Sequence, residues 1–168
     1  LNLNKNKFKN IKPKDALNHP KWQMGKKISV DSATLINKIL ELIEAQKLFN
    51  IPEEKLKILI HPESLVHAII KLKNGLIKFI YHETSMIIPL ANAIFNNKIK
   101  INDFLKLNDK KKYLLTFREV DKNIFPIIRI KKRINEYPST SIILNASNEI
   151  LVDQFLNKKI PFSSISKI

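Results

Sequence analysis

The sequence of 168 residues contains no cysteine and only two glycines, Gly25 and Gly75. Without cysteine, the chain has no disulfide bond, no thiol nucleophile and no cysteine-ligated metal centre. A dinucleotide-binding fingerprint or a P-loop needs several glycines at fixed offsets, so this chain carries neither loop. No apolar run approaches the length of a membrane span, and no signal peptide is visible.

The two ends of the sequence lead us to expect an internal piece of a longer protein. The first residue is Leu rather than Met, and it opens a polar tract, LNLNKNKFKNIKPKD. The last residues, PFSSISKI, read as the start of another structural element. A chain of this length still suffices for one domain with a substantial core.

Acidic residues are scarce, with 15 against 30 basic residues and a net charge of +15. Such a balance is typical of proteins that bind nucleic acids. However, 27 of the 30 basic residues are Lys and they are scattered. The densest clusters, Lys110–Lys112 and Lys131–Arg133, are not interleaved with the aromatic residues on which bases stack. We therefore favour a solvated surface and expect no nucleic-acid or membrane partner, with a basic polyanion-binding module as the alternative.

The strongest pattern in the chain lies between Ile28 and Phe49, ISVDSATLINKILELIEAQKLF. At about 100° per residue, apolar side chains fall in one arc and polar side chains fall opposite them. Asp31 and Ser32 stand where a helix N-cap is expected, so the pattern predicts an entry strand or loop followed by one two-sided helix. The apolar arc consists of Leu35, Ile36, Ile39, Leu40, Leu42 and Ile43, and Thr34, Asn37, Lys38, Glu41 and Ala45 lie opposite.

The polar face of this helix has the composition of a phosphate site beside a cation site. A helix N-terminus favours an anion, and Ser32 and Asn37 can add neutral donors while Lys38 adds a positive charge. Glu41, one turn further along, can ligate a hard cation. The alternative is an ordinary surface helix, in which Asn37–Glu41 and Lys38–Glu41 are common helix pairs.

The segment before this helix, HPKWQMGKK at residues 19–27, differs in character from the polar tract around it. It places Trp22 and Met24 beside Gly25, and large apolar side chains next to a flexible glycine suit a lid that closes over a ligand. The alternative is a loop whose Trp packs into the core.

Asn74-Gly75 is the strongest hairpin signal in the chain. It predicts paired strands at Leu65–Leu72 and Leu76–His82, with Leu72 opposite Ile77, Ile70 opposite Phe79, and one face in the core. His67 and His82 then face each other. We favour a structural histidine pair over a zinc site, because the sequence has four histidines and no metal-type spacing.

The remaining elements complete an α+β pattern. In the last predicted helix we expect Ile142, Ile143, Ala146, Ile150 and Leu151 to point inward, and Asn145, Asn148 and Glu149 to form a capped or exposed polar face. We also expect His61 to form a hydrogen bond at a strand end. The other predicted elements are helices at Lys14–Leu17, Ser85–Phe95, Pro126–Tyr137 and Thr140–Leu156, strands at Lys57–His61 and Tyr113–Phe117, and a turn of helix at Asp103–Leu107.

Three segments carry a resemblance to a known family. HPKWQMGKKISVDSATLINKILELIEA at residues 19–45, IHPESLVHAII at residues 60–70 and LNASNEI at residues 144–150 resemble 1-deoxy-D-xylulose 5-phosphate reductoisomerases. The resemblance implies that residues 1–168 form a catalytic-domain segment, truncated at both ends, with a lid at residues 19–27. It implies an α+β fold with a mixed sheet and a hairpin packed against helices.

The resemblance also assigns roles to residues. It implies that Lys38 and Glu41 are catalytic, with Glu41 ligating a divalent metal, and that Gly25 borders NADPH. Trp22 and Met24 become the covering side chains of the lid. The residues that would contact the substrate are His19, Ser32, Asn37, Lys38 and Glu41.

For the whole protein the resemblance implies an enzyme of the non-mevalonate isoprenoid route. That enzyme converts 1-deoxy-D-xylulose 5-phosphate to 2-C-methyl-D-erythritol 4-phosphate with NADPH and Mg²⁺ or Mn²⁺. It is expected to be a homodimer through the 65–82 hairpin, in a bacterial cytoplasm or a plastid. We expect this segment alone to be inactive, because the NADPH domain and further metal ligands are missing.

Two departures from the family pattern are visible. YHETSMIIPLANAIF at residues 81–95 differs from the more usual acidic, proline-containing version, and Ile39 replaces a common glycine. An inactive, degenerate relative therefore stays open as an alternative.

Overall fold

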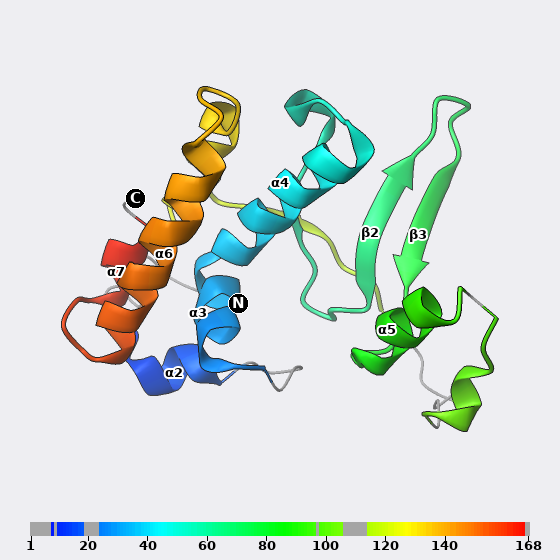
Figure 1. Ribbon diagram of the computed structural model, residues 1–168, viewed down its shortest axis with the longest axis horizontal. Coiled ribbons are helices and arrows are strands. Elements are labelled where there is room, and N and C mark those ends of the chain that lie inside the picture. The colour runs from blue at the N-terminus through cyan, green and yellow to red at the C-terminus, as the bar shows by residue number, and fades with distance from the viewer. Residues whose placement is uncertain (1–7, 9, 19–23, 97, 106–113, 167–168) are drawn as a thin grey trace. The chain divides into compact units, whose positions relative to one another are not determined.

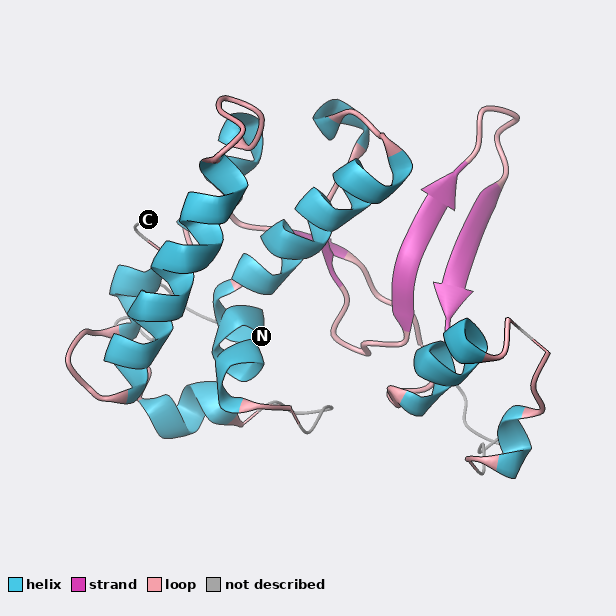
Figure 2. Ribbon diagram, in the orientation of Figure 1, coloured by secondary structure: helices cyan, strands magenta, loops and turns pink. Residues whose placement is uncertain are grey.

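The computed structural model describes residues 8, 10–18, 24–96, 98–105 and 114–166. The chain divides into two compact units, one formed by residues 1–59 and 119–168 and the other by residues 60–118. The first unit is mainly helical, and the second contains a β-hairpin and a short helix (Figures 1 and 2). The α+β class is confirmed.

The first unit contains α2 (Pro13–Leu17), α3 (Lys26–Thr34), α4 (Ile36–Phe49), η1 (Glu53–Lys55), η3 (Pro126–Arg133), α6 (Thr140–Leu156) and α7 (Phe162–Ile165). The second contains β2 (Val66–Lys71), β3 (Ile77–Tyr81), α5 (Ile87–Ile94) and η2 (Ile101–Asp103). β1 (Leu59–Ile60) and β4 (Arg118–Glu119) pair where the chain passes from one unit to the other. Among the described residues, no helix is long and apolar enough to cross a membrane.

Four buried phenylalanines form the aromatic centre of the first unit. The ring of Phe8 lies 5.5 Å from that of Phe125 and 4.9 Å from that of Phe162, and Phe155 lies 5.3 Å from Phe162. All three contacts are edge-on, the arrangement that aromatic quadrupoles favour. Segments far apart in the sequence therefore meet in one core.

The predicted N-cap at Asp31–Ser32 is wrong. A helix, α3, already begins at Lys26 after Gly25, so Asp31 and Ser32 lie in its later turns. α3 ends at Thr34, and the next residue, Leu35, adopts a left-handed conformation with φ of 66° and directly precedes α4. The sequence pattern did not reveal this break between the two helices, because leucine, like other residues with a Cβ, rarely adopts a positive φ.

The apolar arc predicted for α4 is largely confirmed. Ile36, Ile39, Leu42 and Ile43 are buried, at the spacing that one face of a helix requires. α4 ends at Phe49, and Asn50 follows with φ of 50° as a left-handed cap.

Thr34 is fully buried, contrary to its expected place on the polar face. Its hydroxyl lies 3.1 Å from the carbonyl oxygens of Val30 and Asp31, and it accepts a 3.4 Å bond from the N–H of Ile36. Thr34 therefore joins the end of α3 to the start of α4.

α6 has the predicted bounds, Thr140–Leu156, but the predicted inward face is wrong. Ile142, Ile143 and Ile150 are exposed by 58–69%. The buried positions are Leu144, Asn148, Val152 and Phe155. The helix is apolar on more than one side, so periodicity alone did not select the side that packs.

In the second unit, the predicted hairpin forms with a different register. Lys71 pairs with Ile77 and Ile69 with Phe79, one residue away from the prediction, and an irregularity falls between Val66 and Ala68. The cause is a three-residue loop closed between Leu72 and Leu76, in which Gly75 has φ of +87°.

The expected core face of the hairpin is wrong for β3. Each residue of β3 is exposed, and Ile77, Phe79 and Ile80 are exposed by 50–52%. A one-residue slip exchanges the two faces of a strand, but here neither face of β3 is buried in this chain.

Most of the other predicted elements are shorter in the structure. η3 takes the place of the α-helix predicted at Pro126–Tyr137. The short helix η2 ends at Asp103, where the predicted helical turn Asp103–Leu107 begins, and residues 106 and 107 lie outside the described residues. No strand forms at residues 114–117 of the strand predicted at Tyr113–Phe117, and the two-residue β4 follows at Arg118–Glu119; Tyr113 lies outside the described residues.

Candidate functional site

Asn37, Lys38 and Glu41 meet on the first turns of α4. The side-chain amide of Asn37 donates to Glu41 Oε1 at 2.5 Å, and the ammonium of Lys38 donates to Glu41 Oε2 at 2.6 Å. The side chains of Lys38 and Glu41 are each 45% exposed. The cluster therefore offers an ammonium, an amide and a carboxylate that a ligand from solvent can reach.

The cluster lies at the positive end of a helix of 14 residues. The first turn of an α-helix has N–H groups without intrahelical partners, and its dipole favours an anion. In α4, the N–H of Ile36 is already bonded to Thr34, while Asn37 and Lys38 follow it in the same turn. The geometry thus suits an anionic group near Lys38, with Glu41 one turn away.

Ser32 lies on α3, on the other side of the left-handed residue Leu35. It is half-buried, and its carbonyl oxygen accepts a 3.3 Å bond from the N–H of Leu35. Within the described part of the chain, no hydrogen bond joins its side chain to Asn37, Lys38 or Glu41. The structure brings three of the predicted residues into one bonded cluster and places Ser32 across the helix junction from it.

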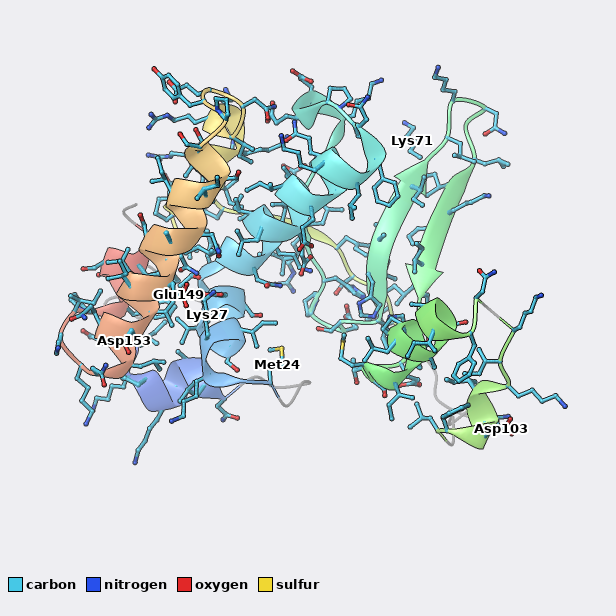
Figure 3. The ribbon with its side chains drawn as sticks, in the orientation of Figure 1. Met24, Lys27, Lys71, Asp103, Glu149 and Asp153 are labelled. Carbon is cyan, nitrogen blue, oxygen red and sulfur yellow. The ribbon has the colours of Figure 1, made fainter. Side chains whose placement is uncertain are left out.

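His19 and Trp22 lie outside the described residues. Met24 is half-buried and Gly25 is exposed, immediately before α3 (Figure 3). A Cβ at Gly25 would meet no atom of the described residues within 4 Å. The carbonyl oxygen of Gly25 accepts a 3.0 Å bond from the hydroxyl of Ser29 in the first turn of α3, and Lys26 and Lys27 of the 19–27 segment already belong to this helix.

A buried polar contact next to Ser32 was missed by sequence reasoning. Asp31 is 2% exposed, and its carboxylate accepts 2.7 Å and 2.8 Å bonds from Lys27 and Asn148. Asn148 is fully buried, contrary to the exposed or capped face predicted for it. The i,i+4 spacing of Lys27 and Asp31 could have indicated their pairing, but no sequence signal connects either residue with Asn148.

A second polar cluster lies in the other unit. Glu63 accepts bonds from the backbone N–H of Thr116 at 3.2 Å and from its hydroxyl at 2.7 Å. These bonds, led by the Thr116 hydroxyl, lower the pKa of Glu63 below its ordinary value. His61 Nδ1 lies 2.8 Å from the carbonyl oxygen of Thr116, which confirms its predicted hydrogen bond. The cluster joins the segment after β1 to the segment before β4.

The predicted juxtaposition of His67 and His82 is confirmed. Their rings stack at 3.8 Å between centroids with an interplanar angle of 10°. Across the described ranges, no group of three or more His, Asp or Glu side chains is arranged to hold a metal ion.

Two protein-family models match this chain, and both describe C-terminal domains of reductoisomerases. Residues 1–49 match the 1-deoxy-D-xylulose 5-phosphate reductoisomerase C-terminal domain, and residues 82–168 match the DXP reductoisomerase C-terminal domain. The chain belongs to the 1-deoxy-D-xylulose 5-phosphate reductoisomerase family.

Curated relatives agree over the whole chain. The reductoisomerase of Pelagibacter ubique is 46% identical over 166 residues, covering 98% of this chain and 43% of the relative. The reductoisomerase of Persephonella marina is 43% identical over 166 residues, covering 98% of this chain and 44% of the relative. The chain thus spans less than half the length of the curated relatives that it matches.

Solved structures share the fold. The reductoisomerase of Zymomonas mobilis in complex with NADPH has a TM-score of 0.86 and 34% identity, over 99% of this chain and 43% of that one. A reductoisomerase in complex with NADPH, fosmidomycin and magnesium has a TM-score of 0.91 and 34% identity, over 99% of this chain and 41% of that one.

Proposed function

We propose that the whole protein converts 1-deoxy-D-xylulose 5-phosphate to 2-C-methyl-D-erythritol 4-phosphate, using NADPH and Mg²⁺ or Mn²⁺. Residues 1–168 would form the segment of its catalytic domain that binds substrate and metal. The observation that carries the proposal is the Asn37–Lys38–Glu41 cluster at the start of α4, within a chain of this family.

The phosphate of the substrate would bind at the start of α4. Lys38 supplies a positive charge, and Asn37 and Ser32 supply neutral donors. His19 would complete the contacts. A phosphate held away from the reacting carbons supplies binding energy that orients them, so these residues act chiefly by positioning.

Glu41 fits a role as one metal ligand. The side chain of Glu41 is 45% exposed. Mg²⁺ prefers oxygen ligands, and it commonly binds one or two carboxylates of the protein and completes its coordination with oxygens of water or substrate. A bound divalent ion would polarise the substrate carbonyl as a Lewis acid. Both oxygens of Glu41 now accept bonds from Asn37 and Lys38, so we expect these bonds to rearrange when ligands bind.

The lid at residues 19–27 would close over the bound substrate. Trp22 and Met24 would cover the substrate and exclude water from the site. Gly25 would border NADPH, and in support no atom of the described residues lies within 4 Å of a Cβ built on its backbone.

The whole protein would act as a homodimer through the β2–β3 hairpin. Support comes from the exposed apolar side chains Ile77, Phe79 and Ile80 on β3, since an apolar surface of this kind favours association. The relatives described above are bacterial, which favours a bacterial cytoplasm over a plastid as its location.

Turnover by the full-length protein tests the proposal. Wild type should oxidise NADPH when given 1-deoxy-D-xylulose 5-phosphate and Mg²⁺, and Glu41→Gln should abolish this while leaving the melting temperature intact. Glu44→Gln, an exposed carboxylate on the same helix, is the matched control and should keep its activity. Metal-independent turnover by Glu41→Gln would contradict the role of Glu41.

The same preparation separates the alternatives. A basic polyanion-binding module would bind nucleic acid with an affinity that falls smoothly with salt and hardly depends on one lysine. A degenerate relative would fold but show no turnover with any divalent metal.

A further inference from the structure

The contact between Asp31 on α3 and Asn148 on α6 joins residues 117 positions apart in the sequence. Both side chains are buried, with 2% and 0% exposure. The atom of Asn148 that contacts Asp31 is its amide nitrogen, because an ionised carboxylate can only accept hydrogen bonds. Figure 3 labels Lys27 on α3 and Glu149, the residue after Asn148, on the two helices that this bond joins.

A buried carboxylate is costly unless it is paired. Asp31 has two partners, the ammonium of Lys27 at 2.7 Å and the amide of Asn148 at 2.8 Å. Lys27 belongs to the same helix and its side chain is 43% exposed. Among the described residues, Asn148 alone therefore ties Asp31 to a different element.

Asn148 has one paired and one unpaired polar atom. Its Oδ1 atom is buried and has no hydrogen-bond partner among the described residues. An unpaired buried acceptor opposes folding, and this cost partly offsets the stabilisation that the amide nitrogen gives by pairing with the buried carboxylate of Asp31. What Asn148 contributes that an apolar side chain of similar size could not is the bond between α6 and α3 at Asp31.

The position of Asp31 indicates the role of this bond. Ser32 is the next residue, and Thr34, which bonds to the carbonyl oxygen of Asp31, also accepts from the N–H of Ile36. Asp31 thus lies in the last turn of α3, beside the junction from which α4 starts, and Asn37 and Lys38 lie in the first turn of α4.

We propose that Asn148 is a positioning residue for the phosphate site. By holding Asp31, it would keep Ser32 on α3 and the first turn of α4 in the arrangement that receives the substrate phosphate. This inference rests on the proposed function. It assigns to the LNASNEI segment a role that acts through α3 rather than by direct contact.

The test uses the full-length protein and three variants. Asn148→Leu keeps the size of the side chain and removes the donor, and the KM for 1-deoxy-D-xylulose 5-phosphate should rise about tenfold, the equivalent of one hydrogen bond to a charged group. The kcat should change by less than about threefold, because an interaction that stabilises the bound substrate and the transition state equally affects KM and not kcat. Asp31→Asn keeps an acceptor for Asn148 and should hold KM within about threefold of wild type.

Val152→Ala is the matched control for destabilisation. Val152 is 2% exposed on the same buried face of α6, so its truncation loosens the core without touching Asp31. It should lower the melting temperature while leaving KM unchanged. Hydrogen exchange should be faster at residues 31–38 in Asn148→Leu than in Val152→Ala, whether or not substrate is present.

The outcomes separate this inference from the proposed function. Absence of turnover by wild type overturns the proposed function and this role with it. Turnover by wild type, with KM unchanged in Asn148→Leu or raised equally in Val152→Ala, overturns the positioning role alone. Unchanged exchange at residues 31–38 in Asn148→Leu overturns it as well.

Discussion

Replacing Lys38 by Ala should weaken substrate binding while hardly changing the stability of the fold. The size of each effect follows from the contacts of Lys38. The only ion pair recorded for Lys38 in the described part of the chain is with Glu41, at 2.6 Å. Both side chains are 45% exposed, so solvent screens the pair and its contribution is less than about 1 kcal/mol. Ala also has the highest helix propensity. Lys38→Ala should therefore shift the melting temperature by less than about 4 °C.

The expected effect on substrate binding is larger. An ammonium that donates to a phosphate forms a charge-assisted hydrogen bond, and losing such a bond costs about 1.5–3 kcal/mol. That range corresponds to about a 10- to 100-fold rise in KM for 1-deoxy-D-xylulose 5-phosphate. Glu41 keeps its bond to Asn37 in this variant, so the carboxylate stays oriented.

Steady-state kinetics and thermal melting of the full-length protein measure both quantities. Lys47→Ala, an exposed lysine in the last turn of α4, is the control for loss of one positive charge and should leave KM unchanged. An unchanged KM in Lys38→Ala would refute the assignment of the phosphate to the start of α4. An equal rise in Lys47→Ala would show that overall charge, rather than position, attracts the substrate.

Three further changes test the fold and its pH dependence. Phe162→Ala should lower the unfolding free energy by about 3–5 kcal/mol in urea denaturation, because Phe162 is fully buried between Phe8 and Phe155; a loss below about 1 kcal/mol would contradict this packing. The folded pKa of Glu63 is lowered, so its stabilisation is present at neutral pH and is lost as the pH falls through the ordinary carboxylate range, about 4.3, toward the folded value. Glu63→Gln should thus be less stable than wild type at pH 7, with a difference that shrinks in acid; a constant difference would contradict the linkage. Gly75→Ala should destabilise the hairpin by about 1 kcal/mol because φ is +87°, and faster hydrogen exchange in β2 and β3 would show it.

The sequence alone predicted features that depend on neighbours along the chain. The apolar arc of α4, the bounds of α6 and the hairpin at Asn74-Gly75 all follow from periodicity or turn chemistry. The Asn37–Lys38–Glu41 cluster also follows, since residues three and four apart meet on any helix. The family was recognised from contiguous motifs.

Tertiary structure decided what local pattern leaves open. The left-handed turn at Leu35 is stabilised by its surroundings, including the buried Thr34, and no propensity of Leu predicts it. The inward face of α6 was chosen by packing, which buried Asn148 and left Ile142 exposed. Asp31 and Asn148 met because two helices pack together, and a contact across 117 positions depends on that packing rather than on either residue's neighbours.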